Sequence, residues 1–132
     1  EKPVSDIALC DIDGDSGDEL ACIEPFHGDR FTVYRHTGGV YKPCYEYPGE
    51  VAFGHAIWGG GLRGQNVFLC GCRAGNRELF MLRWNGSEIT SEILETGRGT
   101  SNVHAVPGND YDLLLTANRE SGEAAVFIVT DD

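Results

Sequence analysis

The stretch SDIALCDIDGDSGDELACIEPF, residues 5–26, decides the fold class of this 132-residue chain. Two short apolar runs, at 7–12 and 19–26, flank an acidic turn that contains two glycines. Short runs of apolar and β-branched residues bounded by Gly and Asp are typical of β-strands. The stretch therefore predicts two strands that are joined by a tight acidic loop.

The same pattern continues along the chain. Further apolar runs are separated by turn signals, such as HTGG at 36–39, WNGS at 84–87 and ESGE at 120–123. No segment shows a sustained apolar period of 3.6 residues, so the sequence predicts an all-β protein. The further strands are expected at 30–35, 40–47, 55–58, 66–72, 78–84, 89–95, 102–106, 111–117 and 124–130.

The predicted strands group in fours. Gly54-His55-Ala56-Ile57 is followed 49 residues later by Val103-His104-Ala105-Val106, and Ser5-Asp6-Ile7-Ala8 precedes it by 49. A period of about 46–49 residues with four strands per unit is typical of β-propeller blades. We expect blades at about 5–49, 50–98 and 99–132, of which the last has three strands. An ordinary β-sandwich is the alternative.

This number of blades is too small for a closed ring, because propellers close with about four to eight. A partial propeller leaves the faces of its first and last blades uncovered, and open edges invite pairing. We therefore expect the chain to be a segment of a longer protein or to associate with other copies of itself.

The acidic loop carries the strongest chemical signal. Its carboxylates fall at positions 1, 3, 5 and 9, and position 7 could offer a backbone carbonyl. Ca²⁺ takes about six to eight oxygen ligands, and crowded carboxylates repel one another without a cation. Position 12 is Cys22 instead of Glu, so the loop is not an EF-hand. The predicted calcium ligands are Asp11, Asp13, Asp15, Gly17 and Glu19. We expect a stabilising ion more than a catalytic one; a solvated acidic turn is the alternative.

The stretch ALCDIDGDSGDELACIEP resembles the FG-GAP repeat of integrin alpha chains, also called the VCBS repeat. That family places D-x-D-G-D-G-x-x-D-L between two strands of one propeller blade, and the resemblance implies Ca²⁺ at the blade edge. Ser16 replaces the usual Gly of the pattern, and Glu19 replaces the usual Asp. The corresponding segments GGGLRGQN at 59–66 and GNDYD at 108–112 lack a full ligand set, so we expect one calcium site.

Histidines give a weaker signal. His55 and His104 share one repeat position in this alignment, and Asp6 is the nearest equivalent in the first unit. In a propeller such positions converge on the central channel, where they could hold a transition metal or act as acid and base. With His27 they form a weak candidate catalytic set. The alternative is that each histidine satisfies local backbone groups.

A second polar set follows the second strand of each unit. Its members, which could rim one face and bind a sugar or an anion, are Glu24, His27, Arg73 and Arg119. Ordinary solvated loop residues are the alternative. The run Gly59–Gly64 matches G-x-G-x-x-G, but a strand follows it, so we expect a long flexible turn and no dinucleotide site. Asn85-Gly86-Ser87 is interpreted as a hairpin turn.

The net charge and the cysteines narrow the classes of partner and the cellular compartment. The net charge of −11 argues against nucleic acid and against an anionic membrane surface. No apolar run approaches the roughly 18 residues of a membrane span. The five cysteines, Cys10, Cys22, Cys44, Cys70 and Cys72, are interpreted as reduced thiols, because four lie in predicted buried strands. Unpaired cysteines slightly favour a cytoplasmic location.

Three functions remain open from the sequence. The first is a calcium-stabilised propeller segment that binds protein or carbohydrate partners without catalysis. The second follows from the resemblance: a part of a propeller sugar lyase, dehydratase or isomerase, with His and acidic groups at the channel. The third is a structural array of blades that completes a larger propeller or oligomer.

Overall fold

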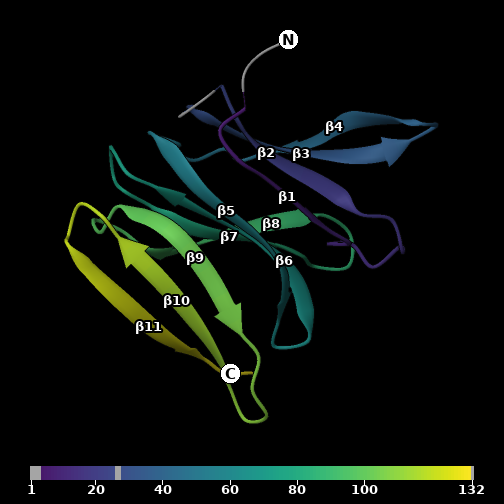
Figure 1. Cartoon of the computed structure of the whole chain (residues 1–132). Helices are drawn as coiled ribbons and strands as arrows, with labels where there is room; N and C mark the ends of the chain where they lie inside the picture. The colour runs from purple at the N-terminus through teal and green to yellow at the C-terminus, as the bar shows by residue number, and fades with distance from the viewer. Residues whose placement is uncertain (1–3, 26–27, 132) are drawn as a thin grey trace.

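The computed structural model describes residues 4–25 and 28–131, and within these ranges it contains strands and no helix (Figure 1). The prediction of an all-β protein is confirmed. The strands are β1 (Ile7–Cys10), β2 (Glu19–Glu24), β3 (Arg30–Thr37), β4 (Val40–Glu46), β5 (Gly54–Leu62), β6 (Gln65–Cys72), β7 (Leu79–Trp84), β8 (Ile89–Glu95), β9 (Thr100–Val106), β10 (Asp112–Asn118) and β11 (Glu123–Val129). The described residues include no helical segment that is long and apolar enough to cross a membrane.

Each sheet is an antiparallel meander of consecutive strands. Sheet A has the order β1-β2-β3-β4, sheet B the order β5-β6-β7-β8, and sheet C the order β9-β10-β11. Sheet A lies within residues 5–49, sheet B within 50–98 and sheet C, which has three strands, within 99–132. That these sheets are propeller blades stays a prediction. Sequential pairing of this kind follows from the short polar turns, which can join only antiparallel neighbours.

Sheet B lies between sheets A and C. Close approach between sheets is concentrated at their first two strands, with β1 beside β5 and β5 beside β9. On β6, Phe68 and Cys70 point into a core shared with sheet A, whereas Val67 and Leu69 point into a core shared with sheet C. A strand buried on both faces needs a continuous apolar run, which explains why NVFLCGC does not alternate with polar residues.

Aromatic side chains fill the core between sheets A and B. The Phe80 ring stacks on the Tyr47 ring with centroids 3.7 Å apart, and it meets the Phe31 ring edge-on at 5.3 Å. The Tyr47 hydroxyl donates a hydrogen bond of 2.9 Å to the buried Glu78 carboxylate. The polar end of the tyrosine is therefore satisfied while its ring joins two sheets.

The glycine run at 59–64 is a correction to the sequence analysis. Gly59 to Leu62 continue β5 instead of forming a long flexible turn, and the turn itself is confined to the two residues that follow. A Cβ at Gly59 would lie 3.0 Å from the Phe68 ring, and one at Gly60 would lie 2.9 Å from the Trp58 ring. Glycine is therefore used here for close packing within a strand. The predicted turn at Asn85 is confirmed, since its side chain accepts from two amides of the turn.

The five cysteines are free thiols. Four of them are buried, as predicted, and Cys44 is exposed. Burial, assisted by the nearby Glu19 charge, raises the pKa of Cys10 to about 12. Burial also raises the pKa of Cys70. Both thiols are therefore protonated at neutral pH, and they pack as small apolar core residues.

Candidate metal centre

The acidic loop joins β1 to β2, and its own side chains hold its shape. The Asp15 amide donates to Asp13 Oδ1 at 3.2 Å, and the Gly17 amide donates to Asp15 Oδ1 at 2.8 Å. The Ser16 amide donates to Asp11 Oδ2 at 2.9 Å. Aspartates favour turns because their carboxylates accept from amides a few residues ahead. Each aspartate thus has a fixed orientation.

Two residues of this loop, Gly14 and Ser16, adopt the left-handed backbone region with φ of 76°. A residue with a Cβ pays about 1–2 kcal/mol for that conformation, and glycine does not. Ser16 therefore adopts this conformation at a steric cost. The hydrogen bond from its amide to Asp11 offsets part of that cost.

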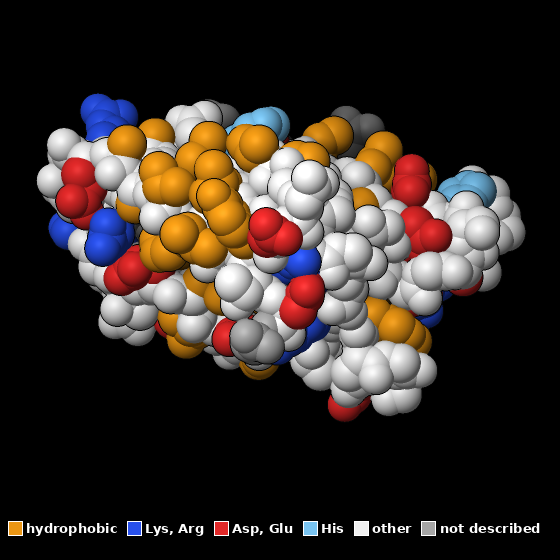
Figure 2. Space-filling view, turned by 90° about the horizontal axis from the view of Figure 1, so that it is seen from below, with side chains coloured by type: hydrophobic (Ala, Val, Ile, Leu, Met, Phe, Trp, Pro, Cys, Tyr) orange, Lys and Arg blue, Asp and Glu red, His pale blue; other side chains and the backbone are white. Residues whose placement is uncertain are grey.

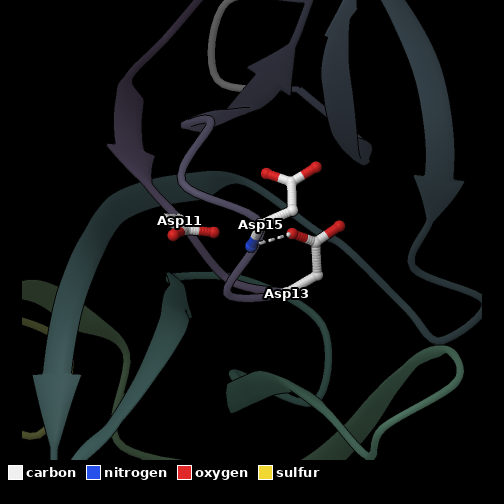
Figure 3. A group of neighbouring side chains, drawn as sticks. All are labelled: Asp11, Asp13 and Asp15. Carbon is white, nitrogen blue, oxygen red and sulfur yellow. Dashed lines mark hydrogen bonds between the residues drawn. The ribbon is translucent and has the colours of Figure 1, made fainter.

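Three carboxylates meet on this loop. One oxygen each from Asp11, Asp13 and Asp15 lies within 4.8 Å of the others (Figure 3). Asp11 Oδ1 is buried and has no hydrogen-bond partner. A buried anionic oxygen without a partner is costly, and a bound cation or a water would relieve that cost. This donor set of hard oxygens suits Ca²⁺ better than a soft transition metal.

Glu19 is another predicted ligand, and it is buried. Its side chain is 1% exposed, and Oε2 accepts from the Ile12 amide at 3.0 Å. Burial, with smaller contributions from Asp13 and Asp15, raises the pKa of this carboxyl above its usual value of 4.5. The residue lies outside the three-carboxylate group, and its participation as a ligand stays a prediction.

Gly17 was expected to offer its carbonyl to the ion. The structure shows its amide bound to Asp15, and its participation as a ligand stays a prediction. Of the five predicted ligands, the structure brings together the carboxylates of Asp11, Asp13 and Asp15.

Arg35 on β3 is a member of this site that the sequence analysis missed. Its Nη2 lies 2.6 Å from Asp13 Oδ2, and its Nε lies 3.7 Å from Glu19 Oε1. The guanidinium therefore neutralises part of the acidic loop without an ion. The sequence alone carries no signal for this position, because it depends on the register of β2 and β3, which pairs Leu20 with Tyr34 and so sets Arg35 opposite Glu19.

The candidate histidines do not share a repeat position. Where β5 pairs with β6, His55 is an extra, bulged residue, and where β9 pairs with β10, Ser101 is the bulged residue. Both bulges lie opposite the end of the second strand of their sheet, at Cys72 of β6 and at Asn118 of β10. Ser101 is therefore the structural equivalent of His55, and the repeat between these sheets is 46 residues.

His104 instead takes the place of Trp58. His104 pairs with Leu115, and Trp58 pairs with Leu69, which lies 46 residues earlier. The dipeptides His55-Ala56 and His104-Ala105 are identical in sequence, but they lie at different pairing positions on β5 and β9. The expectation that His55 and His104 occupy one position on adjacent strands was wrong, because the pairing register spaces equivalent residues of β5 and β9 by 46 residues instead of 49.

The structure uses these polar residues in different places. Asp6 Oδ2 accepts from the Ile57 amide at 3.1 Å and so links sheet A to sheet B. His55 Nδ1 lies 3.0 Å from the Ser101 carbonyl and links sheet B to sheet C. His104 is exposed on β9, and His27 lies outside the described residues. Within 4–25 and 28–131, the one group with metal-ligand spacing is the three aspartates.

The second polar set forms ion pairs and hydrogen bonds. Arg73 Nη2 lies 2.9 Å from Glu120 Oε1 across sheets B and C, and this hydrogen-bonded pair lowers the pKa of Glu120. Glu24 accepts from the Tyr34 hydroxyl and lies 3.8 Å from Arg30. Arg119 is exposed. Binding of a sugar or an anion by this set stays a prediction.

Comparison of the sequence with models of known protein families and with curated proteins finds no match to either.

Proposed function

We propose that this chain is a calcium-stabilised segment of a β-propeller that acts as a binding module for a protein or carbohydrate partner. The observation that carries the proposal is the meeting of three aspartates on a single loop, with the buried Asp11 Oδ1 left without a hydrogen bond. The resemblance of the loop to the FG-GAP repeat supports the same ion.

The arrangement of sheets supports the propeller. Three consecutive meanders stack face to face, and their first strands lie side by side. In a propeller the first strand of each blade lines the centre and the blades pack through apolar faces. A β-sandwich has two facing sheets, whereas sheet B here has an apolar core on each side.

A calcium ion at this loop would stabilise the contact between sheets A and B. The Asp11 carbonyl accepts from Asn66 Nδ2 of sheet B at 2.7 Å, so the loop is part of that contact. When bound, the ion supplies positive charge that holds the three carboxylates together. Asp11, Asp13 and Asp15 would hold it, and Arg35 would share Asp13 with it or move away.

Thermal unfolding tests this proposal. The wild-type chain should melt at a lower temperature in EGTA and recover when Ca²⁺ is restored, because a ligand that binds only the folded state stabilises it. Asp11→Asn should abolish the calcium-dependent shift. Asp18→Asn is the matched control, since Asp18 is an exposed aspartate of the same loop outside the three-carboxylate group. A wild-type chain whose melting temperature ignores calcium would overturn the proposal.

The structural array is the second candidate function. It is favoured by a specific observation: large apolar side chains are exposed on the outer faces of the first and last sheets. The enzyme hypothesis lacks such support, because His55 bonds to a carbonyl between sheets B and C while His104 lies exposed on β9.

A further inference from the structure

The outer face of sheet C is apolar and open to solvent. Val126 and Ile128 on β11 are 63% and 66% exposed, and Val106 on β9 is 38% exposed. Leu113 and Leu115 on β10 pair with these strands on the same face. Figure 2 shows hydrophobic side chains gathered in one continuous patch on the side of the molecule where sheet C lies. Exposed patches of this kind mark interaction sites.

This outer face repeats a surface that the chain already uses internally. Leu115 and Val126 are paired across β10 and β11 as Leu69 and Met81 are paired across β6 and β7. Leu69 and Met81 are buried in the core between sheets B and C. The outer face of sheet C is therefore equivalent to the face of sheet B that accepts the next sheet.

The outer face of sheet A is the complementary surface. Ile7 and Leu9 are 57% and 51% exposed, whereas the alternate residues Ala8 and Cys10 point into the core with sheet B. Leu20 on β2 pairs with Leu9 and shares its face. This is the face directed away from the following sheet, as Phe68 and Cys70 of sheet B are directed away from sheet C.

We infer that two copies of this chain associate head to tail, with the outer face of sheet C of each copy packed on the outer face of sheet A of the other. The inference rests on the propeller part of the proposed function and is independent of calcium. Each new contact would repeat the apolar packing seen between sheets A and B and between sheets B and C.

Closure explains why the occupant is a second copy. One chain carries both halves of the repeating contact, at opposite ends of its stack. Two copies of three sheets give six, which lies within the roughly four to eight blades of closed propellers. A closed pair buries two such contacts at once and leaves no apolar end face, whereas an open head-to-tail contact would continue into filaments.

Sedimentation velocity of the 132-residue chain tests the inference. The expected mass is twice the 14.4 kDa of one chain. A reducing agent is included because Cys44 is exposed and could form an artificial disulfide. Added salt should strengthen the association, because each copy carries a net charge of −11 and the contact is apolar.

Three substitutions of exposed residues locate the contact. Val126→Asp alters the outer face of sheet C, and Ile7→Asp alters the outer face of sheet A. Each should shift the chain to the mass of a monomer. Ile93→Asp is the matched control, because Ile93 is 51% exposed but lies on β8 of the middle sheet. It should leave the dimer intact.

Mixing the two variants tests the head-to-tail geometry. The Ile7→Asp chain keeps a wild-type face on sheet C, and the Val126→Asp chain keeps one on sheet A, so the mixture should regain association through one contact. Pairing of like faces predicts that only one of the two variants dissociates, and that result would overturn the inference. A monomeric wild-type chain, or an open-ended assembly, would also overturn it. A dimer that forms equally in EGTA would support it even if calcium fails to bind.

Discussion

Arg35 is predicted to compete with the calcium ion for Asp13. Its guanidinium lies 2.6 Å from Asp13 Oδ2, and its side chain is 37% exposed. A partly exposed ion pair is worth up to about 1 kcal/mol. A cation that displaces Arg35 from Asp13 must recover this free energy, and 1 kcal/mol corresponds to roughly fivefold in Kd.

Arg35→Gln should therefore tighten calcium binding by roughly fivefold, which isothermal titration calorimetry would measure. The same variant should melt at a lower temperature than wild type in EGTA, because Asp13 and Glu19 lose their nearest cation. The calcium-induced rise in melting temperature should thus be larger than in wild type.

Arg83→Gln is the matched control for this prediction. Arg83 forms an ion pair of 2.9 Å with Glu92 in sheet B, away from the acidic loop. Its removal should leave the calcium affinity unchanged. If Arg35→Gln weakened calcium binding, Arg35 would be a residue that organises the site, and the reasoning from competition would be refuted.

Three further predictions concern stability. Phe80→Ala should lower the free energy of unfolding by about 3–5 kcal/mol in urea titrations, because Phe80 is fully buried between two rings; a loss below 1 kcal/mol would contradict this packing. Gly71→Ala should cost about 1–3 kcal/mol, since its Cβ would lie 2.7 Å from the Thr100 carbonyl oxygen of sheet C. Gly61→Ala, whose Cβ would have no neighbour closer than 3.9 Å, should be nearly neutral, and equal losses would refute the distinction. The pKa of Glu19 is higher in the folded chain than its usual value of 4.5, so as the pH falls the folded chain binds a proton at Glu19 at a higher pH than the unfolded chain does. The free energy of unfolding in EGTA should therefore rise as the pH falls from 7 toward 4.5. Glu19→Gln should be more stable than wild type in EGTA at pH 7, and its melting temperature should depend less on pH. A melting temperature that depends on pH as strongly as in wild type would contradict the attribution of this effect to Glu19.

The strands could be predicted from the sequence because their signals are local. Each apolar run is bounded by Gly, Asn or Asp, and the hairpin at Asn85 is specified by its own side chain. The glycines at 59–61 were predicted to form a turn, because glycine favours turns by its local preference. They form a strand by pairing with Phe68, Val67 and Asn66 of β6, and this pairing overrides the local preference.

The candidate site was predictable in part. The odd spacing of Asp11, Asp13 and Asp15 places them on one tight loop, and the structure brings their carboxylates together. The position of Arg35 depends on the register between β2 and β3, which the letters do not display. The histidine alignment failed for a related reason, because the pairing register sets the repeat between sheets B and C at 46 residues, whereas the matching letters suggest 49.

Direct calcium titration tests the central claim most directly. Calorimetry on the EGTA-stripped chain should show one bound Ca²⁺ per chain, with binding lost in Asp11→Asn and retained in Asp18→Asn. Absence of binding to the wild-type chain, or equal binding by both variants, would contradict the assignment of the ion to the three aspartates.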